Sequence, residues 1–87
     1  MSKWKTPVEL TLEGAGHQTV HGPYAAAMLL MISWPTKNGV ERERAERLCL
    51  EAVEQKIKAA MAREAFLAAI EEAGLTIDNP GTNPLAA

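Results

Sequence analysis

Nine consecutive apolar residues, Tyr24 to Ile32, constrain the fold of this 87-residue chain more than any other segment. A helix is predicted over residues 23–33, because Pro23 at the first helical position loses no hydrogen bond and presets φ. Pro35 ends the helix, since its ring disfavours helical geometry at Trp34. The apolar run is too short for a membrane span, which needs about 20 residues.

A helix that is apolar on every side is normally buried on every side. A chain of this length buries only roughly 60 to 65% of the surface that its unfolded state exposes, so it has few layers with which to cover such a helix. We therefore expect a homodimer, either with Tyr24, Met28 and Met31 as candidate dimer contacts or with two hairpin edges joined into one sheet. The alternative is a monomer whose later helices wrap the first.

The residues before this helix alternate with the period of a half-buried strand. Apolar and polar side chains stand on opposite sides: Val8, Leu10 and Leu12 against Glu9, Thr11 and Glu13. Residues 14–16 are a glycine-rich turn, and residues 17–21 read as a second, weaker strand. The N-terminal region is therefore predicted to form a β-hairpin.

Two amphipathic helices are predicted after the apolar one, over residues 40–54 and 57–73, with Gly74 as the natural stop of the second. Their apolar stripes are out of phase, so the helical segment should be interrupted near Gln55, although no glycine or proline enforces an interruption. A single bent helix is the alternative. Residues 75–77 are long enough for a short third strand. The prediction is one α+β domain over residues 1–77, a hairpin followed by three helices, with a flexible tail at 78–87.

Charge and cysteine content narrow the classes of partner. The net charge of −2 supplies no electrostatic attraction to nucleic acid or to anionic lipid, so neither is expected as a partner. Cys49 is the single cysteine, so the chain can form no internal disulfide and no zinc site based on several cysteines. A secretory signal pattern is missing, and a cytoplasmic location is expected.

The chain resembles a known family in several short elements whose order and spacing matter. These are Pro7-Val8, Val20 before Gly22-Pro23, Trp34-Pro35 with Gly39, Ala45 with Cys49, and Ala62-Arg63 with Phe66 before Ala73-Gly74. The family is the domain of unknown function 982, short proteins of α-proteobacteria, and the resemblance covers about Trp4 to Leu75. Such proteins often carry a glycine between the last two helices, where this chain has residues 54–56. The family has no assigned activity, so the resemblance supports the domain prediction without implying a function.

Three residues are candidates for a ligand site. Arg63 stands in an Ala-Arg-x-x-Phe stretch and either pairs with an acidic residue or binds an anion; Trp34 either packs as a corner between helices or contacts a ligand or partner. Cys49 lies on an apolar helical stripe, where a thiol is usually buried and unreactive. A pocket lined by Arg63 and Trp34 would favour ligand binding.

The two histidines, His17 and His21, are too far apart along a strand to bind one metal ion. No residues with the spacing of a catalytic site stand out, and neither does a phosphate-binding loop, a set of metal ligands or a cofactor-binding motif. The sequence favours a non-enzymatic interaction or accessory module that binds itself or another protein. A small-ligand-binding or enzymatic module using Arg63, Trp34 or Cys49 is the alternative.

Overall fold

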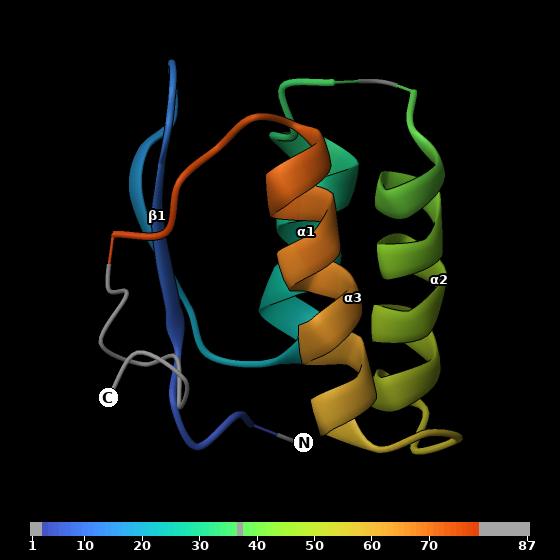
Figure 1. Cartoon of the computed structure of the whole chain (residues 1–87). Helices are drawn as coiled ribbons and strands as arrows, with labels where there is room; N and C mark the ends of the chain where they lie inside the picture. Colours follow the sequence, from blue (N-terminus) through green and yellow to red (C-terminus); the bar gives the residue numbers. More distant parts are fainter. Residues whose placement is uncertain (1–2, 37, 79–87) are drawn as a thin grey trace.

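The computed structural model describes residues 3–36 and 38–78. Within them the chain forms an antiparallel hairpin followed by three helices, which confirms the predicted α+β class. The elements in chain order are β1 (Val8–Leu12), β2 (Gly16–Val20), α1 (Pro23–Ile32), α2 (Val40–Val53) and α3 (Ala59–Glu72) (Figure 1).

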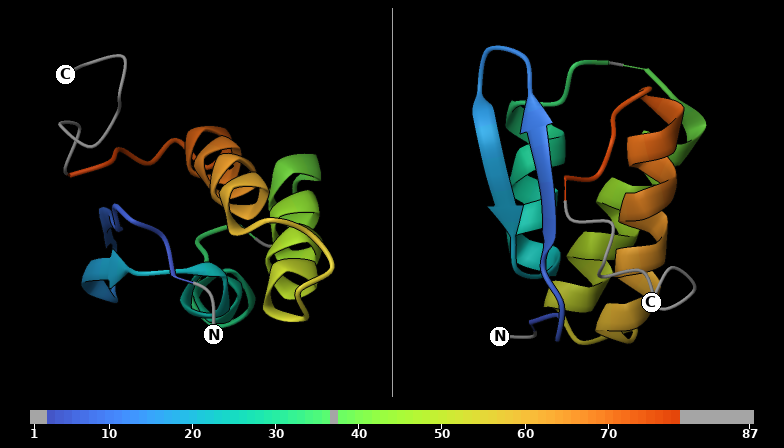
Figure 2. Two further views of the ribbon diagram at one scale, coloured as in Figure 1. Left: turned by 90° about the horizontal axis from the view of Figure 1, so that it is seen from below. Right: turned by 60° about the vertical axis from the view of Figure 1, so that its left-hand side comes forward.

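The elements stack in three layers. Seen along the helices, α1 and α3 lie between the hairpin on one side and α2 on the other (Figure 2). The hairpin pairs Val8 with Val20 and Leu12 with Gly16. Because paired residues of an antiparallel sheet share a face, Val8, Leu12 and Val20 all turn toward the helices, where they are buried.

The segment after α3 returns to the hairpin but forms no strand of its own. Leu10 and Ile77 form an isolated antiparallel bridge, so the third strand expected over residues 75–77 is reduced to one residue pair. The backbone N–H of Asp78 donates to the carbonyl of Glu9 at 2.6 Å. Asp78, the first residue of the predicted tail, is thereby held to β1, and residues 79–87 lie outside the described residues.

Phe66 occupies the centre of the core, on the alanine-rich buried face of α3. Its ring is fully buried. The ring centroids of Trp4 and Trp34 lie 5.9 and 5.7 Å from it, both tilted, which is the favourable range for aromatic pairs. The N-terminal segment, α3 and the corner after α1 therefore meet at one side chain.

The predicted break between α2 and α3 is confirmed, and hydrogen bonds show how it forms without glycine. The N–H of Gln55 donates to the carbonyl of Ala52 at 3.0 Å, and the N–H of Lys56 to that of Glu51 at 2.9 Å. This pair of bonds is a Schellman motif, which needs a left-handed residue just after the helix. Gln55 takes that conformation with φ of 63°.

The same motif ends α3, with a glycine at the left-handed position. Gly74 has φ of 74°, its N–H donates to Glu71, and the N–H of Leu75 donates to Ile70, both at 3.0 Å. The chain thus contains one Schellman motif built on glycine and one built on glutamine. A glycine at position 55 would remove the strain of a side chain at φ above zero.

We predict that Gln55→Gly stabilises the protein. Relief of the left-handed strain exceeds the entropy that glycine adds to the unfolded chain, so the free energy of unfolding should rise by about 0.5 to 1 kcal/mol. Lys56→Gly is the matched control, since Lys56 is not at positive φ and glycine there should only destabilise. Urea denaturation of both variants measures the effect, and a loss of stability in Gln55→Gly would contradict this account.

Candidate functional site

The helix α1 carries two apolar stripes on different sides. The core stripe, at the spacing i, i+3, i+4 and i+7, is buried and consists of Pro23, Ala26, Ala27 and Leu30. The outer stripe, at i, i+4, i+7 and i+8, is exposed and consists of Tyr24 (50%), Met28 (38%), Met31 (51%) and Ile32 (71%). The spacing places the members of each stripe on one face of the helix.

The outer stripe of α1 contains the three residues that sequence analysis named as dimer contacts, Tyr24, Met28 and Met31. The structure brings them together in the row where their helical spacing puts them. Ile32 extends the row and is its most exposed member, although the sequence analysis did not single it out. Its spacing of eight residues from Tyr24, which places both residues on one helix face, could have identified Ile32 from the sequence.

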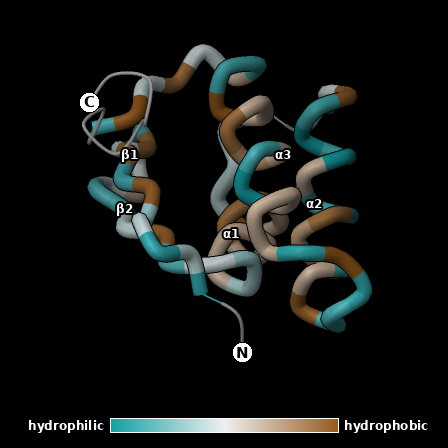
Figure 3. The backbone as a smooth tube through the Cα atoms, turned by 60° about the horizontal axis from the view of Figure 1, so that its bottom comes forward, coloured by the Kyte–Doolittle hydropathy of each residue, from teal (hydrophilic) through white to brown (hydrophobic). Residues whose placement is uncertain are grey.

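This stripe is free of charge along its whole length. The helix has no acidic residue in its first turn and no basic residue in its last turn. By contrast, α2 alternates between hydrophilic and hydrophobic residues along its length (Figure 3). No helix in the described part of the chain combines the length and apolarity that crossing a bilayer requires.

Large apolar side chains are exposed elsewhere only at scattered positions of the described chain. Val40 and Leu50 lie on α2 and Met61 lies on α3, whereas four of the seven exposed large apolar residues lie on α1. Single exposed apolar residues are common on soluble proteins, but a contiguous apolar patch marks an interaction surface. The outer stripe of α1 is therefore the strongest candidate for contact with another protein.

Arg63 pairs with no acidic side chain among residues 3–36 and 38–78. Its Nε donates to the backbone carbonyl of Thr6 at 3.2 Å, which ties α3 to the N-terminal segment. The side chain also lines a pocket of about 340 Å³, together with residues 3–6 and the first two residues of α3. The tryptophan in this pocket is Trp4, and Trp34 is not among the lining residues.

Trp34 lies at the corner after α1, buried against Phe66. This placement matches the packing interpretation of the Trp-Pro pair and leaves little surface for a ligand. Trp4, which sequence reasoning did not propose as a site residue, is the tryptophan beside Arg63. Its flanking residues, Lys3 and Lys5, gave no periodic pattern from which its burial could be predicted.

Cys49 is fully buried on the core side of α2, as its stripe position predicted. Burial raises the pKa of its thiol to about 12, because the interior disfavours the charged thiolate. The thiol S–H donates a weak hydrogen bond to the carbonyl oxygen of Ala62, with the sulfur 3.9 Å from that oxygen. A thiol in this state is protonated at neutral pH and is not a nucleophile.

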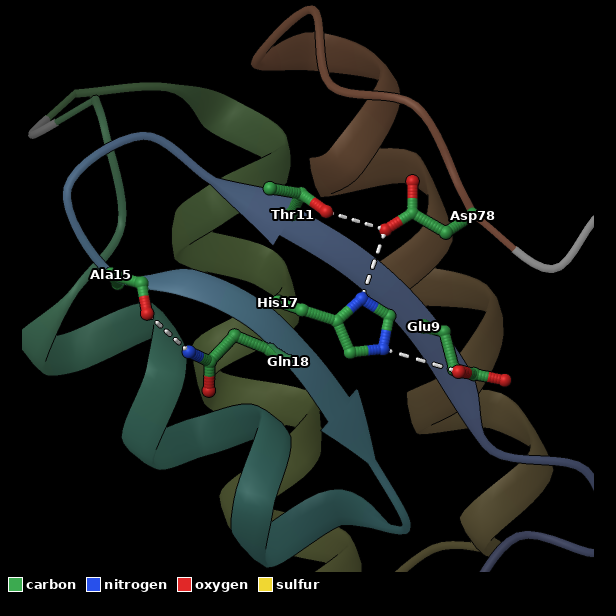
Figure 4. Close-up of polar contacts among 6 residues, drawn as sticks. All are labelled: Glu9, Thr11, Ala15, His17, Gln18 and Asp78. Atoms are coloured by element: carbon green, nitrogen blue, oxygen red, sulfur yellow. Dashed lines mark hydrogen bonds and ion pairs between the residues drawn. The ribbon is translucent and has the colours of Figure 1, made fainter.

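His17 joins a polar cluster on the outer face of the hairpin (Figure 4). Its Nε2 lies 3.2 Å from a carboxylate oxygen of Glu9, and its Nδ1 lies 3.3 Å from one of Asp78. The hydroxyl of Thr11 donates to the same Asp78 oxygen at 2.6 Å. Because that hydroxyl is bonded to a carboxylate and not to the imidazole, the cluster is not arranged to activate a nucleophile.

The cluster around His17 fastens the segment after α3 to β1 through groups that are largely exposed, where ion pairs contribute little. His21, the other histidine, lies exposed just after β2. Among residues 3–36 and 38–78, no group of three or more His, Cys, Asp or Glu side chains is placed to hold a metal ion.

Comparison with known proteins agrees with the fold. A family model described as "Protein of unknown function (DUF982)" matches residues 6–77. The NMR structure of a protein from Agrobacterium tumefaciens, a structural genomics target, is 32% identical, with a TM-score of 0.69. The match covers 83% of this chain and 72% of that one. No curated protein matches the chain.

We predict that Cys49 reacts very slowly with a thiol reagent in the native protein. At pH 8 a pKa of about 12 in place of 9.0 leaves roughly a thousandfold less thiolate, before any loss of access is counted. Labelling by Ellman's reagent, followed by absorbance, should therefore become fast only in denaturant. Native labelling at the unfolded rate would show that the thiol is accessible.

Proposed function

We propose that the chain, which belongs to the DUF982 family of proteins of unknown function, is a non-enzymatic interaction module that forms a homodimer through α1. The observation that supports this proposal is the charge-free apolar row of Tyr24, Met28, Met31 and Ile32 on the exposed side of that helix. Burying such a row removes apolar surface from water at roughly 25 cal/mol per Å². No ionised group on α1 would have to be desolvated in the process.

A second copy of the chain suits this row better than an unrelated partner, because the row is complementary to itself. A two-fold axis near Met28 would set two copies of α1 antiparallel, with Tyr24 of one copy opposite Met31 of the other. A thioether against the edge of an aromatic ring is a favourable contact. Each copy would supply both halves of that contact, so one patch serves both subunits.

The hairpin edge is the weaker route to a dimer. One side of β1 is already occupied by the bridge between Leu10 and Ile77, so pairing of hairpins would have to use β2. That strand is five residues long, and its outward face carries the polar side chains of His17 and Thr19. An edge of this kind buries little apolar surface when it pairs.

An enzymatic role for Cys49 or Trp34 has little support from their placement. Both side chains are buried, and the thiol of Cys49 is held in its neutral form. A cytoplasmic location is part of the proposal. It is supported by the single reduced cysteine, which suits a reducing compartment.

We predict that Met31→Glu separates the dimer into monomers. Size exclusion with light scattering at micromolar concentration should give about twice the chain mass of 9.4 kDa for the wild type and the single mass for this variant. Glutamate and methionine have similar helix propensities, so the fold should persist, which circular dichroism checks. The variant places a charge in the apolar contact, which is costly to bury unpaired.

Met61→Glu is the matched control for this experiment. Met61 is a methionine of nearly equal exposure, 48% against 51% for Met31, on a different helix. The control variant should remain a dimer. A wild-type mass near 9.4 kDa, or equal dissociation of both variants, would rule out dimerisation through α1.

A further inference from the structure

We propose that the pocket between the N-terminal segment and the start of α3 binds the phosphate group of a small organic phosphate. The pocket is lined by Lys3, Trp4, Lys5, Thr6, Ala59, Ala60 and Arg63. It holds about 340 Å³, which is at the small end of the range for small-molecule sites. This site is separate from the outer stripe of α1 and does not depend on dimerisation.

The lining concentrates positive charge in a chain that is acidic overall. Lys3, Lys5 and Arg63 contribute three cations, and no carboxylate lines the pocket. Ion pairs within the described residues engage other cations, on α2 and just after it, and leave these three without an acidic partner. Like charges placed together without counter-charges favour an anion between them.

Arg63 is held in place in a way that leaves part of its guanidinium available. Its Nε is committed to the carbonyl of Thr6 at 3.2 Å, which fixes the plane of the group. The two terminal nitrogens carry the remaining donors, and a fixed guanidinium matches the geometry of phosphate oxygens. Lys3 and Lys5 are exposed residues of the same lining and can add point charges.

The walls of the pocket are fixed by hydrogen bonds before any ligand arrives. The indole N–H of Trp4 donates to the carbonyl of Ala59 at 2.8 Å, and its backbone N–H donates to that of His21, also at 2.8 Å. A preformed site loses less entropy on binding. Ala59 and Ala60 present only methyl groups, so the space beside the indole remains open to the organic part of a ligand.

A phosphate group suits this site better than a monocarboxylate does. It carries about 1.5 to 2 negative charges at pH 7 and several acceptor oxygens, which matches three cations more closely than a single charge would. A nucleic-acid backbone needs a longer basic track, and the net charge of −2 opposes it. The apolar wall formed by Trp4 and the two alanines favours a phosphate that bears an organic group.

Amide NMR titration of the full chain tests the proposal, with phenyl phosphate, inorganic phosphate and acetate as probes at constant ionic strength. Phenyl phosphate should give saturable shifts confined to residues 3–6 and 59–63, with inorganic phosphate weaker and acetate weakest. Equal affinity for the two phosphates would assign the site to free phosphate and overturn the organic part of the proposal. Absence of saturation, or shifts centred elsewhere, would overturn all of it.

The double variant Lys3→Gln/Lys5→Gln removes two pocket cations whose side chains make no ion pair or hydrogen bond within the described residues, so the fold should persist. We expect its affinity for phenyl phosphate to fall by about tenfold or more. The charge-matched control is Arg47→Gln/Lys56→Gln, at exposed positions outside the pocket lining, and it should bind as the wild type does. Equal weakening of binding in both double variants would show that the net charge of the protein alone attracts the phosphate. That result would refute a specific site at this pocket.

Discussion

The contact of Phe66 with two tryptophans is the interaction on which the arrangement of the other elements depends. Trp4 comes from the N-terminal segment, Trp34 from the corner after α1, and Phe66 from α3. Much of the remaining core is alanine, which fills little volume by itself. Three of the four aromatic residues in the sequence therefore supply, at one point, the bulk that closes the space between the hairpin and the helices.

This aromatic contact also explains why one side of α1 remains exposed to solvent. Trp34 holds the end of the helix to the core, and Ala26 and Ala27 let the helix approach closely on its inner side. The large side chains on its other side, from Tyr24, Met28, Met31 and Ile32, then have no place within the chain. Tyr24, the fourth aromatic residue, stands at the start of that outer row, half exposed. The packing that makes the domain compact thus creates the surface through which we propose that it dimerises.

The hairpin and the two later helices could be predicted from the sequence because polar residues mark the phase of each element. In β1 the alternation from Val8 assigns every side chain to a face, and on α2 the stripe that contains Cys49 correctly predicted its burial. α1 has no polar residue to mark its phase, so the sequence predicted a helix that is buried on every side; it named Tyr24, Met28 and Met31 as dimer contacts but not Ile32. The pocket at Arg63 was also beyond sequence reasoning, since contacts between residues more than fifty apart create it.

The break after α2 shows that residue type alone does not determine which residue takes the left-handed conformation at a helix end. Gln55 adopts a conformation that favours glycine because two backbone hydrogen bonds of the helix end require it. The out-of-phase stripes of α2 and α3 predicted a break near Gln55, but not that Gln55 itself takes the left-handed conformation. Tertiary packing of the two stripes therefore outweighs a local cost of about 1 to 2 kcal/mol.

An isotope-filtered NOE experiment tests directly whether the outer stripe of α1 packs against the same stripe of a second copy. A mixed sample would combine protein carrying labelled methionine methyl groups with unlabelled protein. The account predicts cross-subunit signals between the methyl group of Met31 and the ring of Tyr24, because an antiparallel two-fold pairing places them together. A dimer whose intermolecular signals instead join residues of two β2 strands, or a sample with no intermolecular signal at micromolar to millimolar concentration, would contradict it.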